Sequence, residues 1–185
     1  MQTEFVPGIK SRPVYGPVTI NPRSQRQIFI SQGHITQELL SLYDGCQQGE
    51  KTMLAVGVAG DASAGGEVVS LEGLSDYAAT LPQSSSFYLA GTEAFMWDTA
   101  RLLNDAGFIS DQIHMLPPVS NERRLFCTHC YTLMEHVTRS PHTCTGCGRK
   151  LLVRDHFSRI HRAYVGVQID AEDPEDLPDH TEELN

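Results

Sequence analysis

Short apolar runs alternate with amphipathic segments between residues 27 and 118. The run IFIS predicts a buried strand, and the TQELLSLY segment after it predicts a helix. This helix has Thr36 as its candidate N-cap and places Leu39, Leu40 and Tyr43 at helical spacing. The runs TMLAVGVAG, SSFYLAG and IHMLPP predict three further strands. Strands alternating with helices predict an α/β domain with a small doubly wound parallel sheet.

Two more segments lie between these strands. The Gly/Ala/Ser-rich stretch after TMLAVGVAG predicts a loop, followed by a short segment at Leu71–Ala79. A longer helix is expected from the N-cap Thr92 through Asn104, with Gly107 as its stop signal. Its apolar face consists of Phe95, Met96, Ala100 and Leu103.

Composition predicts four parts along the chain. Residues 1–25 are rich in Pro and Gly and predict an extended N-terminal arm, and residues 26–118 hold the α/β domain. After a polar linker, residues 123–168 predict a small metal-stapled domain. Residues 169–185 carry too little apolar surface to offset their ordering entropy, which predicts a mobile acidic tail unless a partner holds it.

Charge is unevenly distributed within the net −9. Residues 1–122 hold six basic and thirteen acidic side chains, whereas residues 123–162 hold eight basic and two acidic ones. The last sixteen residues hold eight acids and no base. The chain therefore consists of an acidic domain, a basic module and an acidic tail, a pattern that bears on its partners.

Four cysteines stand in the pattern C-T-H-C, thirteen residues, C-T-G-C-G. They are Cys127, Cys130, Cys144 and Cys147. Each C-x-x-C directs two sulfurs to one centre, and thirteen residues suffice for a hairpin that joins the two pairs into a tetrahedron. Thiolates in this geometry favour Zn(II), so the pattern predicts a structural zinc ribbon whose closed coordination leaves no position to activate water. Iron, as in rubredoxins, is the main competing metal.

Other residues near this motif have a lesser role. The histidines are interpreted as surface or second-shell groups, because the cysteine set is complete; they are His129, His136, His142, His156 and His161. Arg149, Lys150 and Arg154 are candidates to offset the −2 charge of a zinc tetrathiolate. Cys46 is expected to be a buried core thiol, because no motif places a base beside it.

The segments between Gln27 and Pro117 resemble the pyridine-nucleotide half of ferredoxin-NADP-reductase-type enzymes. IFISQGHITQELLSLY is similar to the first strand, Gly-rich turn and helix of that family. FYLAGTEAFMWDTARLLNDAGFISDQIHM is similar to its later strand, turn, helix and final strand. The resemblance implies a domain with the fold of a nucleotide-binding half.

The differences from that family lie where its chemistry takes place. Gly33 remains in the first turn, but Gln32 and His34 stand where the family has glycine, and Gln37 where it has proline. Backbone N–H groups reach a pyrophosphate only where side chains are small, so these side chains predict the loss of nucleotide binding. Three further replacements are Ala90 for the family's cysteine, Thr92 for its proline, and Leu116, Pro117 and Pro118 for its acidic-x-aromatic ending. We expect no catalytic and no cofactor-binding residue on this chain.

Over its whole length the chain resembles the small subunit of bacterial dimethylamine monooxygenase, most specifically in the ribbon and in the segment Leu151–Tyr164. The resemblance implies an auxiliary subunit of a complex that uses NADPH and O2 to convert dimethylamine to methylamine and formaldehyde. It also implies partner catalytic and reductase subunits that carry flavin, an iron-sulfur cluster and heme.

An alternative class is a zinc-ribbon nucleic-acid-binding protein, because aromatic residues are interleaved with the basic ones. These are Phe126, Tyr131, Phe157 and Tyr164. The acidic domain and tail argue against it, since they would repel phosphates. The first residues lack the layout of a secretory signal and no run is long enough to span a membrane, so a cytoplasmic protein without membrane contact is expected.

Overall fold

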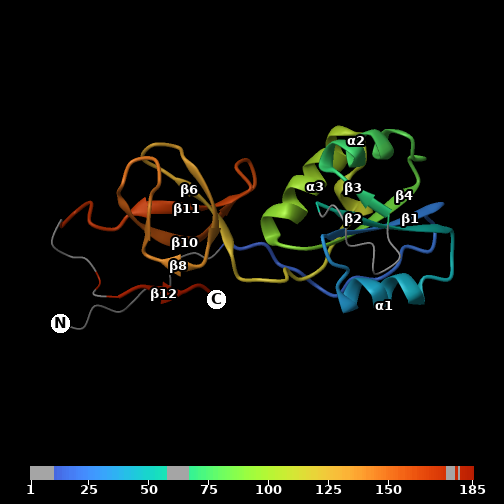
Figure 1. The fold of residues 1–185 in the computed structure, drawn as a ribbon, viewed down its shortest axis with the longest axis horizontal. Coiled ribbons are helices and arrows are strands. Elements are labelled where there is room, and N and C mark those ends of the chain that lie inside the picture. The colour runs from blue at the N-terminus through green and yellow to red at the C-terminus, as the bar shows by residue number, and fades with distance from the viewer. Residues whose placement is uncertain (1–10, 58–66, 174–177, 179) are drawn as a thin grey trace. The chain divides into compact units, whose positions relative to one another are not determined.

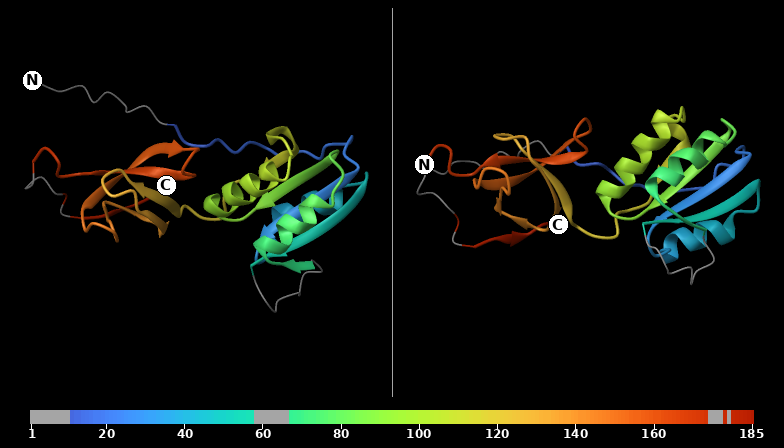
Figure 2. Two further views of the ribbon diagram at one scale, coloured as in Figure 1. Left: turned by 90° about the horizontal axis from the view of Figure 1, so that it is seen from above. Right: turned by 45° about the horizontal axis from the view of Figure 1, so that its top comes forward.

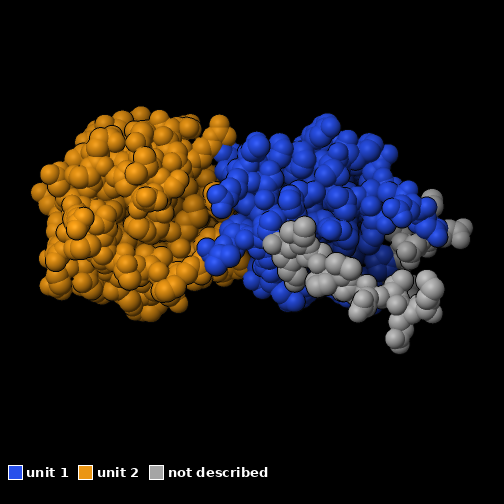
Figure 3. Space-filling model, turned by 180° about the vertical axis from the view of Figure 1, so that it is seen from behind, with its two compact units in different colours: residues 1–14, 121–185 blue, residues 15–120 orange. Residues whose placement is uncertain are grey.

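The computed structural model describes residues 11–57, 67–173, 178 and 180–185. The chain divides into two compact units, residues 15–120 and residues 1–14 with 121–185 (Figure 3). We call the first the α/β unit and the second the ribbon unit. The end of the TMLAVGVAG run, the start of the Gly/Ala/Ser-rich loop predicted after it and most of the predicted N-terminal arm lie outside the described residues.

The α/β unit contains a sheet of five parallel strands in the order β3-β2-β1-β4-β5, of which Figure 1 labels β1 to β4. The chain leaves β1 toward β2 and β3 and then returns to the other side of β1 to form β4. The strands are β1 (Arg26–Gln32), β2 (Glu50–Val56), β3 (Glu67–Val69), β4 (Ser85–Ala90) and β5 (Ile113–Met115). Reversal of the strand order between β1 and β4 creates a switch point, where doubly wound sheets place their ligands.

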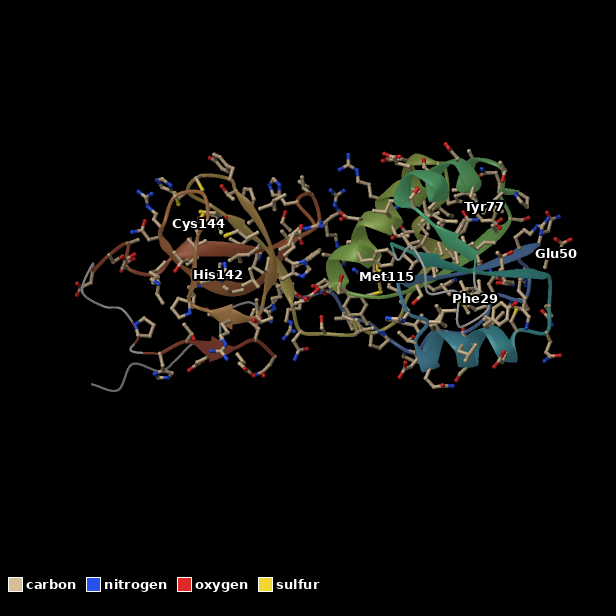
Figure 4. The ribbon with its side chains drawn as sticks, in the orientation of Figure 1. Phe29, Glu50, Tyr77, Met115, His142 and Cys144 are labelled. Atoms are coloured by element: carbon tan, nitrogen blue, oxygen red, sulfur yellow. The ribbon has the colours of Figure 1, made fainter. Side chains whose placement is uncertain are left out.

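Helices pack on both faces of this sheet, as the doubly wound prediction requires. They are α1 (Gln37–Gly45), α2 (Leu71–Ala79) and α3 (Glu93–Asp105), with a 3-10 turn η1 (Ser110–Gln112) before β5. Figures 1 and 2 show α1 on one face and α2 and α3 on the other. Successive side chains of β1 alternate accordingly: Ile28 and Ile30 join the core under α2 and α3, and Phe29 joins the core under α1 (Figure 4).

The helix ends follow the sequence signals. Thr36 Oγ1 accepts the Leu39 N–H at 3.3 Å, and Thr92 Oγ1 accepts the Phe95 N–H at 3.3 Å, so both predicted N-caps are confirmed. The predicted apolar face of α3 is buried, and Gly107 follows its end at φ 99°. The prediction omitted β3, because three residues are too few to show a periodicity.

The ribbon unit is built on a second five-stranded sheet, in the order β7-β6-β11-β10-β9. Strands β6 and β7 form one hairpin, β9 and β10 form another, and β11 lies between β6 and β10. The strands are β6 (Arg123–Cys127), β7 (Leu133–Val137), β9 (His142–Thr143), β10 (Lys150–Ser158) and β11 (Ala163–Gln168). Each hairpin carries one C-x-x-C at its turn, so the fold brings together the two halves of the motif.

Both ends of the described chain contact the ribbon unit. Ser11 bonds along β10, donating its N–H to Asp155 O at 2.8 Å and accepting the Phe157 N–H at 3.1 Å. Near the other end, β12 (Glu182–Glu183) pairs antiparallel with β8 (Arg139–Ser140). This strand lies within the segment for which the sequence predicted a mobile tail, and it forms because β8 offers an open edge.

No helix among the described residues is both long enough and apolar enough to cross a membrane.

Candidate functional site

The four predicted cysteines meet in the ribbon unit. Their Sγ atoms all lie within 4.8 Å of one another, and the sulfur atoms around the labelled Cys144 are visible in Figure 4. Cys127 Sγ lies 3.9 Å from Cys147 Sγ, and Cys130 Sγ lies 3.6 Å from Cys144 Sγ. A tetrahedron with metal–sulfur bonds of about 2.3 Å has sulfur–sulfur edges of about 3.8 Å. The four thiols therefore fit a tetrahedral thiolate-bound metal ion.

The two C-x-x-C turns share one hydrogen-bonding scheme. In the first, Cys127 donates its N–H to Thr132 O at 3.0 Å and its carbonyl accepts the Tyr131 N–H at 2.9 Å. In the second, Cys144 donates to Arg149 O at 2.8 Å and accepts from the Gly148 N–H at 2.9 Å. Tyr131 and Gly148 take equivalent positions at φ 64° and 74°. The halves thus present their sulfurs from two matching turns, as the spacing predicted.

The thiols differ in how readily they ionise. Hydrogen bonds from Thr132 lower the pKa of Cys130 to about 6, whereas burial raises the pKa of Cys144 to about 11. A backbone hydrogen bond from Arg149 lowers the pKa of Cys147, and the Arg149 side chain adds to the effect. Since metal ligands must be thiolates, a cation would have to displace the proton of the buried Cys144.

Arg149 is the one predicted cation for which the structure shows a contact with a sulfur. It also contacts His129 Nδ1 at 3.0 Å and donates to Gln168 Oε1 at 2.8 Å, while Lys150 donates to Thr143 Oγ1. Within the part of the chain that the structure describes, the cluster of possible metal ligands holds the four cysteines and no histidine. Cys46 is 5 % exposed in the core under α1, as expected of a packed thiol.

Little space is left around the sulfurs. A methyl group built on Gly146 would overlap Thr132 Oγ1 and lie 3.2 Å from Cys130 Sγ. Thr132 Oγ1 itself lies 3.1 Å from Cys130 Sγ. Sequence analysis did not single out Gly146 or Thr132, because the packing that restricts them joins opposite hairpins.

A second candidate site lies at the carboxyl edge of the sheet in the α/β unit. The carboxyl ends of β1 and β2 and the start of α2 line an open cavity of about 510 Å³. Its lining includes Gln32, Gly33, His34, Gly57, Ser70 and Phe95. A further cavity of about 390 Å³ is lined by Ala90, Thr36 and the Leu116–Pro118 segment. The residues that distinguish the chain from reductases thus line both spaces.

Gln32 occupies the N-terminus of α3. Its Oε1 accepts the Thr92 N–H at 2.8 Å, a donor at a helix N-terminus of the kind that holds phosphate groups in nucleotide-binding sheets. A Cβ on Gly91 would lie 2.7 Å from Gln32 Cβ, so the side chain also fills the space above the glycine. The His34 side chain is exposed, and its backbone carbonyl accepts a bond from Ser31 Oγ. Gln32 and His34 were both expected to obstruct the site. Of these two, Gln32 accepts a hydrogen bond from the N-terminus of the helix.

Comparison with known proteins bears on the ribbon unit first. Residues 124–167 match the family model described as "Dimethylamine monooxygenase subunit DmmA-like, C-terminal domain". The predicted resemblance is confirmed. The matched segment begins within β6, ends within β11 and includes all four cysteines.

A curated relative supports the same assignment. The chain is 42% identical over 86 residues to the heme-dependent oxidative N-demethylase delta subunit of Ectopseudomonas mendocina (strain ymp). The alignment spans 46% of this chain and 49% of that subunit, so the chain matches about half the length of its relative. No solved structure matches the chain at a significant level.

Proposed function

We propose that Cys127, Cys130, Cys144 and Cys147 bind one zinc ion with a structural role. The sulfur–sulfur distances of 3.9 and 3.6 Å carry this proposal, because both are close to the edge of a zinc tetrathiolate. Four protein ligands fill the coordination sphere, so the ion would hold the two hairpins together without activating water. Elemental analysis of the purified chain is expected to give one equivalent of zinc. A red protein containing iron, or less than half an equivalent of zinc, would contradict it.

We further propose that the chain is an auxiliary subunit of a cytoplasmic, multisubunit amine monooxygenase. The reaction would use NADPH and O2 to convert dimethylamine to methylamine and formaldehyde, with water as the other product. The match of residues 124–167 to the DmmA-like domain and the 42% identity to an oxidative N-demethylase subunit support this proposal. Flavin, the iron-sulfur cluster and heme would belong to the catalytic and reductase subunits, as the resemblance to the dimethylamine monooxygenase subunit implies.

The α/β unit would be a reductase-like domain that no longer transfers hydride. Two observations support this view. The strand order β3-β2-β1-β4-β5 is the order of a doubly wound nucleotide-binding half. Gln32 engages the Thr92 N–H in place of an anion. In this role the unit would position partner subunits for electron transfer rather than take part in the chemistry.

Reconstitution tests the proposed subunit role. The catalytic and reductase subunits are combined with and without this chain, and dimethylamine-dependent NADPH oxidation and formaldehyde release are measured. We expect coupled activity to require the chain. Full coupled turnover without it would remove the proposed role, and a Cys144→Ala chain provides a matched control in which the same polypeptide lacks its metal site.

The basic residues of the ribbon unit do not favour the nucleic-acid alternative. Arg123 pairs with Asp155 at 3.1 Å, Arg124 with Glu135 at 2.5 Å and Arg139 with Glu183 at 3.2 Å. Phosphate binding would have to compete with these internal carboxylates. Specific binding of an oligonucleotide by the chain, without any effect on amine turnover, would reverse this preference.

A further inference from the structure

Strand β8 presents an edge that takes up an acidic strand. Among the described residues it pairs with β12 alone, in a two-stranded sheet apart from the main sheet of the ribbon unit. The register places Glu183 opposite Arg139 and Glu182 opposite Ser140, and the Leu184 N–H donates to Thr138 O at 2.9 Å. Pairing of an extended segment with an open strand edge is a common way of recognising peptides.

Arginines surround this edge at three points. Arg139 Nη2 lies 3.2 Å from Glu183 Oε1. Arg123 Nη2 donates to Asn185 O at 3.0 Å, and Arg12 Nη2 donates to the same oxygen at 2.6 Å. The acidic strand is therefore held by a charge pair along its length and by two guanidinium groups at its end.

The Arg123 side chain is held within the fold and is only 5% exposed. Asp155 Oδ1 lies 3.1 Å from its Nη1, and its guanidinium carbon lies 4.3 Å from the centre of the Tyr164 ring. These contacts fix the guanidinium and leave Nη2 directed at the end of the strand. The backbone beside Arg12 is held as well, because its neighbour Ser11 makes two backbone bonds to β10.

The occupying strand is held weakly. The Arg139–Glu183 pair is 59% and 79% exposed, and exposed pairs contribute at most about 1 kcal/mol. Residues 182–185 bury no side chain fully. Such a segment occupies its site mainly because tethering gives it an effective concentration on the order of millimolar. A longer acidic strand from another protein can displace it.

We propose that β8, together with Arg12, Arg123 and Arg139, is a binding site for an extended acidic segment of a partner protein. The chain's own residues 182–185 fill this site in the absence of the partner. The partner segment would place a carboxylate opposite Arg139 and a backbone carbonyl between Arg12 and Arg123. The acidic end of the chain thus competes with the partner segment, which docks only if it displaces residues 182–185.

The test uses the full chain and a labelled peptide with the sequence of His180–Asn185, amidated at its end. Leu184→Pro removes the N–H that bonds to Thr138 and frees the site without shortening the chain. Fluorescence anisotropy is expected to show the peptide binding this variant about tenfold more tightly than the unaltered chain, because the tethered competitor is gone. Glu183→Arg should have the same effect, whereas Glu172→Arg, with the same change in net charge, should not.

Specificity is checked by a charge swap. In the Leu184→Pro background, Arg139→Glu should weaken binding of the peptide, and a peptide carrying Glu183→Arg should regain it. Metal content and circular dichroism establish that each variant is folded. The proposal would be overturned if the peptide bound neither freed variant, or if Arg139→Glu left its affinity unchanged. Peptide binding is measured on the chain alone, so the result does not depend on the proposed monooxygenase complex.

Discussion

Single residues decide how closely the two halves of the four-cysteine cluster approach. Gly146 faces Thr132 from the opposite hairpin, with no room for a methyl group. We expect Gly146→Ala to lower zinc affinity about 10- to 100-fold, as other changes beside metal ligands do. Competition with a chromogenic chelator measures the affinity. Gly16→Ala is the matched control, because nothing lies within 4 Å of its added methyl group; an unchanged affinity in Gly146→Ala would show that Thr132 gives way.

Gln32 determines whether the second candidate site can bind a phosphate group. Its Oε1 uses the Thr92 N–H that a phosphate would need, so the isolated chain should not bind NADPH with a micromolar dissociation constant. We expect Gln32→Gly to bind NADPH measurably more tightly, because it frees this donor. Titration calorimetry on both proteins checks this. Micromolar binding by the unaltered chain would contradict the prediction, as would a flavin bound to the purified chain.

His114 is expected to make the stability of the α/β unit depend on pH. Its ring stacks on Tyr88 at 5.1 Å, its Nε2 is buried without a hydrogen-bond partner, and burial lowers its pKa below the ordinary value. The unfolded chain takes up this proton near pH 6.5 and the folded chain only at lower pH. The stability contributed by the neutral His114 ring is therefore fully present above about pH 6.5. It is lost as the pH falls toward the pKa of the folded state.

Replacing His114 should remove part of this pH dependence. We expect the free energy of unfolding of His114→Phe to fall less between pH 7.5 and pH 5.5 than that of the unaltered chain. Urea unfolding followed by fluorescence of Trp97, the single tryptophan, reports on the α/β unit. The exposed His34 gives a control, His34→Gln, whose pH dependence should match that of the unaltered chain. Identical slopes for all three proteins would exclude His114 as the cause.

At the scale of elements, the two matching C-x-x-C turns come from separate hairpins that β11 joins in one sheet. A structural zinc site contributes on the order of 10 kcal/mol to folding. Cys144→Ala is therefore expected to unfold the ribbon unit and to leave the α/β unit folded, because each has a separate core. Trp97 fluorescence would keep its native urea transition while the circular dichroism of the β-rich part is lost. Loss of both transitions together would show that the units are coupled.

Elements with local signals were predictable from the sequence, and those that depend on distant partners were not. The caps Thr36 and Thr92 act three residues away, so their helices could be predicted. The pairing of β12 with β8 joins residues more than forty positions apart, and no sequence pattern in either segment predicts it. The four clustered cysteines form an exception among long-range contacts, because the spacing of thiols is itself a chemical signal. The contact of Gln32 with Thr92 has no comparable signal, although the replacement of a glycine indicated its site.

At the scale of the whole molecule, the resemblance is strongest in the ribbon unit. The family match at residues 124–167 covers the metal centre and most of its sheet, whereas the reductase-like character of the α/β unit is supported by strand order alone. Function is therefore best sought in what the ribbon unit binds, and the reconstitution and peptide experiments both address it.

The α/β unit is an insertion within the ribbon unit, since residues 11–14 and 121–185 belong together and residues 15–120 lie between them. Arg12 and Asn185 are joined by a hydrogen bond of 2.6 Å, so the segments before and after the inserted unit contact each other. This arrangement fixes the order in which the chain yields to mechanical force. Tension applied between residues 11 and 185 in an optical trap first loads the bonds of Ser11 and Arg12 to the ribbon unit, and the inserted sheet bears load as soon as these bonds have ruptured.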